Sequence, residues 1–322
     1  MVAFVIQRLI QASLVMLSVG FIAFLLFQFV GDPVVFMLGQ DATPEKAAAL
    51  RAELGLDQPF FIQFYHFALN AIQGDFGISL RQGSKVSTLI IDRLPATLEL
   101  AFVAAVLALL VGIVMGVYVA LHRNNWLSKI LMTVSLVGVS LPTFLIGILL
   151  ILVFAVWLGW FPSFGRGEVV KIGSWTSGLL TVDGLKHLVL PAVTLCFFQL
   201  TLVLRLVRAE MLEVLRTDYI KFARARGLTE RVIHFQHALR NTLVPVITVT
   251  GLQLGSLIAF AIITETVFQW PGMGLLFIQA VTHADIPVMA AYLCLISLIF
   301  VVINLTVDLL YFWVDPRLRS DH

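Results

Sequence analysis

The sequence is poor in charged residues. Aspartate, glutamate, lysine and arginine together make up only 12% of its 322 residues, against about 25% in an ordinary soluble domain. Hydrophobic residues make up 60% of the chain, and the mean hydropathy is +0.98. Because so few polar groups cannot cover the surface of a soluble globule, this composition excludes an ordinary soluble protein and indicates an integral membrane protein.

The chain also lacks the patterns of metal sites and disulfide frameworks. Its two cysteines, Cys196 and Cys294, lie inside apolar runs and are predicted to be small buried residues. His234 and His237 are three residues apart, but no further ligand is close to them in the sequence. We therefore predict that both histidines lie on the surface and that the chain binds no metal.

Motifs for catalysis are missing as well. The sequence contains no Gly-Lys pair, and therefore no Walker A loop for ATP. It has neither a paired histidine and carboxylate motif nor a nucleophile motif, which argues against a membrane-embedded enzyme. We predict no catalytic residues, so energy for any active process must come from another polypeptide or another source.

What the sequence does contain is long hydrophobic runs. Each is long enough to cross the roughly 30 Å hydrocarbon core of a bilayer as a helix. The first run does not end in the small residues of a signal-peptide cleavage site, so it is predicted to be a retained span. The sequence predicts an all-α integral membrane protein with about six transmembrane helices, near residues 9–30, 97–121, 130–160, 187–208, 243–267 and 288–314.

The distribution of basic residues predicts the orientation. Lysine and arginine concentrate on alternate short segments, which the positive-inside rule places in the cytoplasm together with both termini. The chain then divides into an N-terminal end with the first span (1–30), an outer segment (31–96) and a five-span domain (97–322) with a cytoplasmic loop at 209–242. The inner basic residues are Arg8, Arg123, Lys129, the cluster from Arg205 to Arg240, Arg317 and Arg319.

The outer segment after the first span is predicted to be helical. Thr43 is placed to cap a helix with Pro44 at its first position, and Gly55 to end it. After Pro59 comes a second, aromatic-rich helix. Two interpretations of it stay open, namely a helix at the membrane interface or a helix packed on the other spans. The other outer segment, near 161–186, is predicted to be a loop.

The most charged part of the chain runs from Arg205 to Asn241, yet it keeps a helical apolar rhythm. It predicts a helix that ends at Gly227, followed by a second helix that Thr229 caps and that carries Val232, Phe235 and Leu239. Small residues at Ala223, Ala225 and Gly227 leave a narrow surface for the cleft of a partner. Arg224 and Arg226 can pair with acidic groups there. The alternative is a basic loop that serves topology only.

Part of this stretch resembles a known family. Asp218-Tyr219-Ile220 followed by Ala223-Arg224-Ala225-Arg226-Gly227-Leu228 is similar to the EAA loop of binding-protein-dependent ABC importer permeases, especially those for dipeptides, oligopeptides and nickel. The first places of the loop here are Lys221-Phe222-Ala223, and Arg240 stands where the loop usually has proline. Further similar stretches follow in order along nearly the whole chain: Gly31-Asp32-Pro33, 54–59, Gly74-Asp75-Phe76-Gly77, 93–97, 140–144, 187–191, 265–268, 270–274 and Asp315-Pro316-Arg317.

This resemblance implies a type I ABC importer permease in a bacterial or archaeal inner membrane. The implied partners are a second homologous permease, two ATP-binding subunits, an extracytoplasmic solute-binding protein and the lipid bilayer, with no nucleic acid. ATP and magnesium would be bound by the ATPases, and no cofactor by this chain. The implied substrates are short peptides, with nickel, glutathione or another small solute as alternatives. The residues implied to couple to the ATPases are Asp218, Tyr219, Ala223, Arg224, Ala225, Arg226 and Gly227.

Three acidic residues within or near the spans are further candidates. Glu99, Glu265 and Asp308 are costly to place in lipid, which makes them candidates for the translocation path or for pairing with a neighbouring helix. The rival function is an ion-coupled secondary transporter. Such transporters usually have inverted repeats and polar residues at the membrane midplane, and the sequence shows no convincing repeat and few midplane charges.

Overall fold

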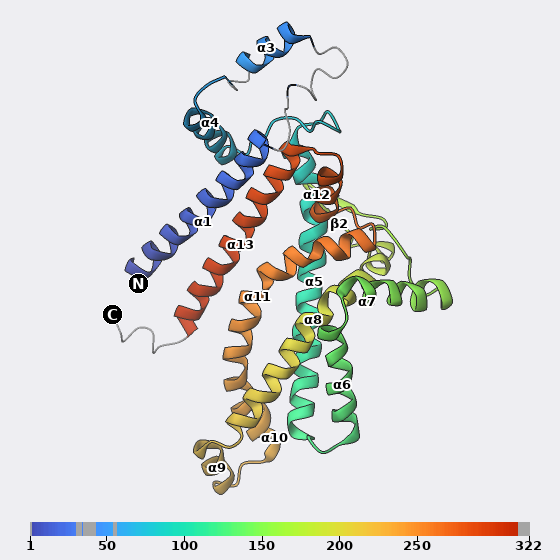
Figure 1. Cartoon of the computed structure of the whole chain (residues 1–322). Helices are drawn as coiled ribbons and strands as arrows, with labels where there is room; N and C mark the ends of the chain where they lie inside the picture. Colours follow the sequence, from blue (N-terminus) through green and yellow to red (C-terminus); the bar gives the residue numbers. More distant parts are fainter. Residues whose placement is uncertain (1, 30–33, 35–42, 54–56, 315–322) are drawn as a thin grey trace. The chain divides into compact units, whose positions relative to one another are not determined.

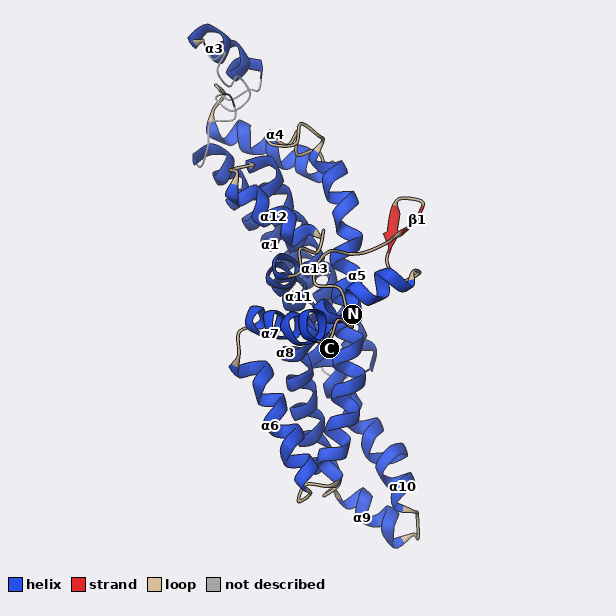
Figure 2. Cartoon of the chain, turned by 90° about the vertical axis from the view of Figure 1, so that its right-hand side faces the viewer, coloured by secondary structure: helices blue, strands red, loops and turns tan. Residues whose placement is uncertain are grey.

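The computed structural model describes residues 2–29, 34, 43–53 and 57–314. The described chain is mostly helical, with connecting loops and a small hairpin of β1 (Val170–Ile172) and β2 (Trp175–Ser177) (Figure 2). Three features discussed above fall outside these residues: Gly31-Asp32-Pro33, the predicted helix end at Gly55, and Asp315-Pro316-Arg317. The chain forms two compact units.

The first unit contains the N-terminal 95 residues and residues 271–302, with a short piece at 172–176. Its helices are α1 (Val2–Phe29), α3 (Pro44–Glu53), α4 (Phe60–Ile72), α12 (Met273–Thr282) and most of α13 (Ile286–Val314). The prediction that the segment after the first span is helical is confirmed. Thr43 accepts a hydrogen bond from the backbone N–H of Lys46 at 3.3 Å and thereby caps α3.

The second unit contains most of the remaining chain, from Ala96 to Lys171 and from Ser177 to Trp270. Two of its segments, η2 and η3, have the wider turns of a π-helix. Its helices are the larger part of α5 (Val86–Leu121), α6 (Trp126–Ser140), α7 (Thr143–Leu150), η2 (Ile151–Trp157), α8 (Val182–Val214), α9 (Asp218–Ala225), α10 (Glu230–Val232), η3 (Ile233–Ala238) and α11 (Leu239–Val267) (Figure 1).

The prediction of about six membrane-crossing helices is confirmed. Five helices among the described residues are long and apolar enough to cross a membrane, and one bent pair brings the total to six. The bent pair replaces the continuous span expected at 130–160, because α6 and the helix of α7 and η2 meet at an angle of 115°. The break falls at Leu141 and Pro142, since proline lacks an N–H donor and forces the residue before it out of the helical conformation.

Four local expectations need correction. Helix α5 begins at Val86, well before the expected residue 97, and runs through Pro95. The 161–186 segment contains the β1–β2 hairpin and the first turn of α8, where a loop was expected. The short apolar helix α12 was not predicted. The second helix after Gly227 continues without a break through α10 and η3 into α11.

Helices α5 and α8 approach each other closely through two glycines of α5. A Cβ atom added at Gly112 would lie 2.8 Å from a methyl carbon of Val203, and one at Gly116 would lie 2.7 Å from Cβ of Val207. The two glycines are four residues apart and therefore share one face of the helix. This spacing is the small-xxx-small pattern that lets membrane helices pack backbone to backbone.

Candidate functional site

The segment that joins α8 to α11, residues 215–238, is called the connector below. It contains helix α9, a turn at residues 226–229, and the helical stretch of α10 and η3 (Figure 1). The turn is sharp because Gly227 has φ +79°, a left-handed conformation that glycine adopts without the strain other residues suffer. The predicted end of the first helix at Gly227 is therefore confirmed. Thr229 occupies the cap position of the next helix, but its side chain makes no capping hydrogen bond.

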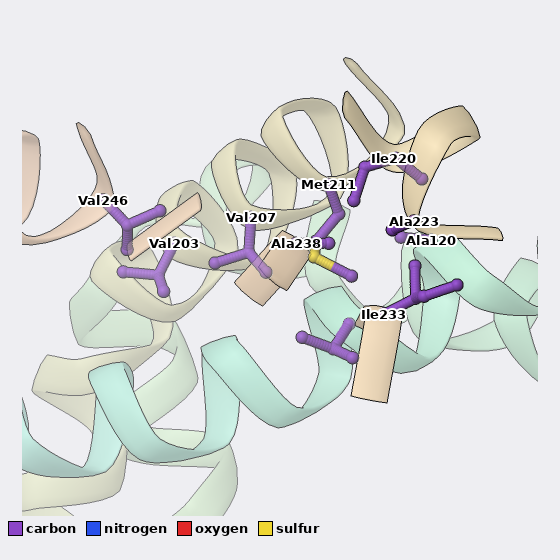
Figure 3. Close-up of a cluster of buried hydrophobic side chains, with 10 residues drawn as sticks. Ala120, Val203, Val207, Met211, Ile220, Ala223, Ile233, Ala238 and Val246 are labelled. Atoms are coloured by element: carbon purple, nitrogen blue, oxygen red, sulfur yellow. The ribbon is translucent and has the colours of Figure 1, made fainter. Parts of the chain in front are cut away.

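One face of α9 is buried against the body of the second unit. Ile220 is fully buried and Ala223 is almost fully buried. Figure 3 shows both side chains directed toward Met211 of α8 and Ala120 of α5. The same apolar cluster contains Ile233 and Ala238 of η3, Val246 of α11, Val117 of α5, and Val203 and Val207 of α8. This core connects α9 directly to three of the long helices.

Polar contacts add to this attachment. The side-chain amide of Asn241 donates a hydrogen bond to the hydroxyl of Tyr219 at 2.6 Å, which ties α9 to the first turn of α11. Across the turn, Arg224 donates two hydrogen bonds to the carboxylate of Glu230, at 2.8 and 3.1 Å. These bonds raise the pKa of the Arg224 guanidinium above its ordinary value. The Tyr219–Asn241 bond thus attaches α9 to α11, whereas the exposed Arg224–Glu230 pair spans the turn within the connector.

The opposite face of α9 is open. Phe222 is 64% exposed, and the guanidinium carbon of Arg226 lies 5.8 Å from the centre of its ring. Tyr219 is 41% exposed, and Leu228 in the turn is also exposed. Exposed aromatic rings on a short, well-anchored helix are typical of a surface that binds another protein.

The predicted coupling residues are divided between these two faces. Asp218, Tyr219, Ala225, Arg226 and Gly227 lie on the surface. Arg224 is also exposed, although its guanidinium is engaged by Glu230 of the same connector. Ala223 is buried, so the expectation that it belongs to the exposed narrow surface was wrong. Its small side chain instead lets α9 lie close against the buried cluster.

Two residues that the sequence analysis did not single out belong to this site. Phe222 is the most exposed large apolar side chain of α9. Asn241 holds Tyr219 although it is 22 residues away in the chain. The exposure of Phe222 could have been predicted from the sequence, since it falls between Ile220 and Ala223 and points to the other side of the helix. No sequence pattern indicated that Asn241 is the partner of Tyr219.

A second polar cluster lies toward the other end of α5 and α11. Glu99 of α5 and Arg166 of the loop before α8 form an ion pair at 2.5 Å, and both side chains are buried. The backbone N–H of Gly178 donates a further hydrogen bond to the same Glu99 oxygen at 3.3 Å. The loop between η2 and α8 is therefore fastened to α5 through the Glu99 carboxylate.

Glu265 and Trp270 extend this cluster to α11. Thr97 donates a hydrogen bond to the fully buried carboxylate of Glu265 at 2.5 Å. The indole N–H of Trp270 donates to the backbone carbonyl of Ala96 at 3.0 Å, and the guanidinium of Arg166 lies 5.9 Å from the indole ring. Glu99 and Glu265 thus occur in one buried network, called the Glu99 cluster below.

Asp308 is not part of that network. It is partly exposed on α13, close to the end of the described chain. None of the described residues form a group of three or more histidines, cysteines or carboxylates that could hold a metal ion. The arrangement of the connector and of the Glu99 cluster accounts for packing and partner contacts, and it places no acid, base and nucleophile together.

Two family descriptions match the chain and together cover nearly all of it. Residues 108–320 match the binding-protein-dependent transport system inner membrane component, and residues 1–101 match the N-terminal part of such membrane components. The chain belongs to this permease family. The resemblance found in the sequence is therefore confirmed, and the ion-coupled secondary transporter is excluded. The permease is a multi-pass membrane subunit of an ABC importer and is not itself a catalytic subunit.

Relatives of the permease match over their full length. A dipeptide transport system permease protein of Alkalihalophilus pseudofirmus is 36% identical over 99% of this chain and 100% of its own. A glutathione transport system permease protein of Escherichia coli is 38% identical over 99% of both chains.

A solved structure has the same fold. A chain of the inward-facing MetNI methionine ABC transporter superposes on the permease with a TM-score of 0.57 at 20% identity, and the match covers 70% of this chain and 96% of that one. This likeness confirms the predicted type I importer fold and nothing finer.

Proposed function

We propose that the permease forms half of the translocation path of an ATP-driven importer for short peptides. Its relatives in Alkalihalophilus pseudofirmus and Escherichia coli are named for dipeptides and for glutathione, which is itself a short peptide. Nickel or another small solute is the alternative cargo. In this proposal a second homologous permease completes the path, and a solute-binding protein delivers the substrate from outside.

In the same proposal two ATPase subunits dock on the connector. The observation that carries this role is the two-sided character of α9, which is buried against three long helices on one face and exposes Phe222 and Arg226 on the other. The residues assigned to docking are Asp218, Tyr219, Arg224, Ala225, Arg226 and Gly227 with Phe222, while Ala223 seats the helix. ATP and magnesium belong to the ATPases, and this chain binds no cofactor.

The geometry suits a mechanical role. The helical stretch from Glu230 to Val267 is continuous, with Pro245 inside it, so a displacement at the connector is carried into α11. From Ala120, beside the connector, to Glu99 helix α5 advances about 30 Å, the thickness of a bilayer core. Closure of the ATPases then acts on one membrane surface, and the Glu99 cluster lies at the other. Such coupling requires contacts that differ between two states.

The orientation follows from this assignment. The connector lies in the cytoplasm, where the ATPases are, and its basic residues agree with the positive-inside rule. Both termini are then cytoplasmic, and α3 and α4 lie on the outer side. Glu99 and Glu265 act in this scheme by holding the outer ends of the helices together, and a direct contact with substrate is not required of them. Asp308 keeps its assignment to the path as a candidate.

The test is substitution on the exposed face of α9. Phe222→Asp and Ala225→Glu should leave the amount of permease in the membrane unchanged and abolish peptide-stimulated ATP hydrolysis in the reconstituted complex. Both positions have ordinary helical backbone and are exposed, so the folding of the chain is preserved. Gly227→Glu should have the same effect, although it also strains the turn because φ at Gly227 is positive.

Gln236→Glu is the matched control, because Gln236 is exposed on the connector but belongs to η3 and not to the exposed face of α9. It should keep full stimulation. Unchanged peptide transport in Phe222→Asp and Ala225→Glu would refute the docking role of α9. Failure of dipeptides and glutathione to stimulate the unaltered complex, with stimulation by a nickel complex instead, would refute the choice of substrate alone.

A further inference from the structure

Helix α4 packs on α1 through one side only. The ring of Phe60 lies 5.1 Å from that of Phe24, and the ring of Phe64 lies 5.4 Å from that of Phe21. Farther along, Phe67 packs against a small cluster that contains Ala23 of α1 and Cys294 of α13. Figure 1 shows α4 beside the C-terminal half of α1. At roughly 100° per residue, Phe60, Phe64 and Phe67 fall within about 60° of one another around α4.

A second apolar stripe of α4 has no cover among the described residues. Phe61 is 81% exposed and Ile72 is 84% exposed. Each residue advances roughly 100° around a helix, so these two side chains point in nearly the same direction. The remaining exposed apolar residues of α4 fall within about 100° of them on the same side: Ile62, Tyr65 and Leu69.

Only a narrow sector of α4 is polar. Gln63, His66, Asn70 and Gln73 fall within about 80° of one another, opposite the direction of Ala68. The apolar surface therefore covers more than half of the helix and extends well beyond the part that α1 occupies. A helix surrounded by water on its free side would lose free energy by exposing two large apolar side chains so completely.

The uncovered stripe lies beside an exposed part of a helix that is apolar and long enough to cross a membrane. Helix α1 is a membrane-crossing candidate with only 11% of its most apolar stretch buried. Its Phe21 and Ile22, beside α4, are themselves 39% and 54% exposed. Because α4 packs against the C-terminal end of α1, its apolar stripe lies near the end of the exposed apolar surface of α1. When α1 crosses a bilayer, its C-terminal end lies at the boundary between headgroups and acyl chains, where aromatic side chains concentrate.

We propose that α4 is an interfacial helix whose stripe of Phe61, Ile62, Tyr65, Leu69 and Ile72 binds the bilayer surface at the C-terminal end of α1. Its polar sector faces water. The binding rests on apolar burial and not on charge, because residues 57–73 contain no lysine or arginine. The ligand is therefore the acyl-chain boundary common to all phospholipids, with no requirement for an anionic headgroup.

The proposal is tested with nitroxide spin labels on the assembled complex in phospholipid nanodiscs. Labels are attached singly at Phe61→Cys, Tyr65→Cys and Ile72→Cys on the stripe, and at Asn70→Cys in the polar sector as the matched control. The native Cys196 and Cys294 are buried, so the unaltered chain serves to check that they stay unlabelled. Power saturation then measures the collision of each label with oxygen, which dissolves in lipid, and with a water-soluble nickel chelate.

Labels on the stripe should collide mainly with oxygen and lie about 5–10 Å below the lipid phosphates, the depth of an interfacial helix. The label at Asn70→Cys should collide mainly with the nickel chelate. These depths should be the same in neutral and in anionic nanodiscs.

Three results would overturn the proposal. Preferential collision with the nickel chelate at the stripe would place it in water. Low collision with both reagents and an immobilised spectrum would place another protein chain on the stripe. If the labels reached this depth only with anionic lipid, the binding would rest on charge attraction and not on apolar burial.

Discussion

The connector and the Glu99 cluster both carry charged side chains, but they use them in opposite ways. In the connector the Arg224 and Glu230 side chains are 44% and 57% exposed, whereas Arg166 and Glu99 of the other pair are 7% and 5% exposed. An exposed ion pair in water contributes little to stability, while a buried pair that loses one partner leaves an uncompensated charge. The charged pair of the connector therefore lies on the surface and adds little to stability, whereas the charged pair of the Glu99 cluster stabilises the fold.

This comparison explains how one subunit can be stiff and still bind a partner. The connector obtains its stability from the apolar cluster beneath α9, which leaves the outward face free for the ATPase contacts that we propose. The loop before α8 is fastened by a buried ion pair and by one backbone hydrogen bond, from Gly178 to Glu99. Substitutions at the two places should consequently affect different measurements.

The largest effect on stability is expected at Arg166. Arg166→Met leaves the Glu99 carboxylate buried without its charge partner, which should destabilise the second unit by about 3–5 kcal/mol. Thermal unfolding of the purified permease in nanodiscs would measure this loss. The double variant Glu99→Leu with Arg166→Met removes both charges and should recover most of it. A single variant as stable as the unaltered chain would show that the pair does not fasten the loop.

A smaller effect is expected at Ile220, on the buried face of α9. Ile220→Ala removes apolar contacts from the cluster beneath the connector and should cost about 2–3 kcal/mol, the lower part of the range for such truncations. The loss should be local, so hydrogen exchange should increase in residues 218–225 more than in α5. Peptide-stimulated ATP hydrolysis should fall because the connector no longer transmits displacement. Normal exchange with lost stimulation would place Ile220 in the docking surface instead.

The smallest effect on stability is expected at Arg224. Arg224→Gln removes the exposed pair with Glu230, and the unfolding temperature should not shift detectably because water already screens these charges. The same variant should weaken ATPase docking, measured as the protein concentration needed for half-maximal assembly. A clear loss of thermal stability would mean that the pair fastens the turn, and the contrast with the Glu99 cluster would disappear.

Much of this fold was predictable because it depends on local patterns. Apolar runs of bilayer length predict helices wherever they occur, and Thr43 with Pro44 marks the start of α3. Gly227 ends α9 because the positive φ needed there is a property of glycine itself. The break at Pro142 was available from the same kind of reasoning, since the residue before proline avoids the helical conformation.

The site was predictable only in part. The position of the connector in the chain followed from its residues, but the division of α9 into two faces did not. Ala223 and Ala225 are equally small, yet one is buried and the other exposed because the apolar cluster occupies only one side of α9. The pairing of Glu99 with Arg166 joins residues 67 positions apart, and no local pattern carries that information.

The sequence by itself determined that this chain is a helical membrane protein with a charged, glycine-broken connector, because hydropathy and backbone preference act over a few neighbouring residues. Only the tertiary structure decided which side chains of α9 are buried, how the Glu99 cluster forms, and which stripe of α4 stays uncovered. These outcomes depend on which residues far apart in the sequence come into contact. The free energies of burial and of ion pairing are therefore determined only in the folded structure.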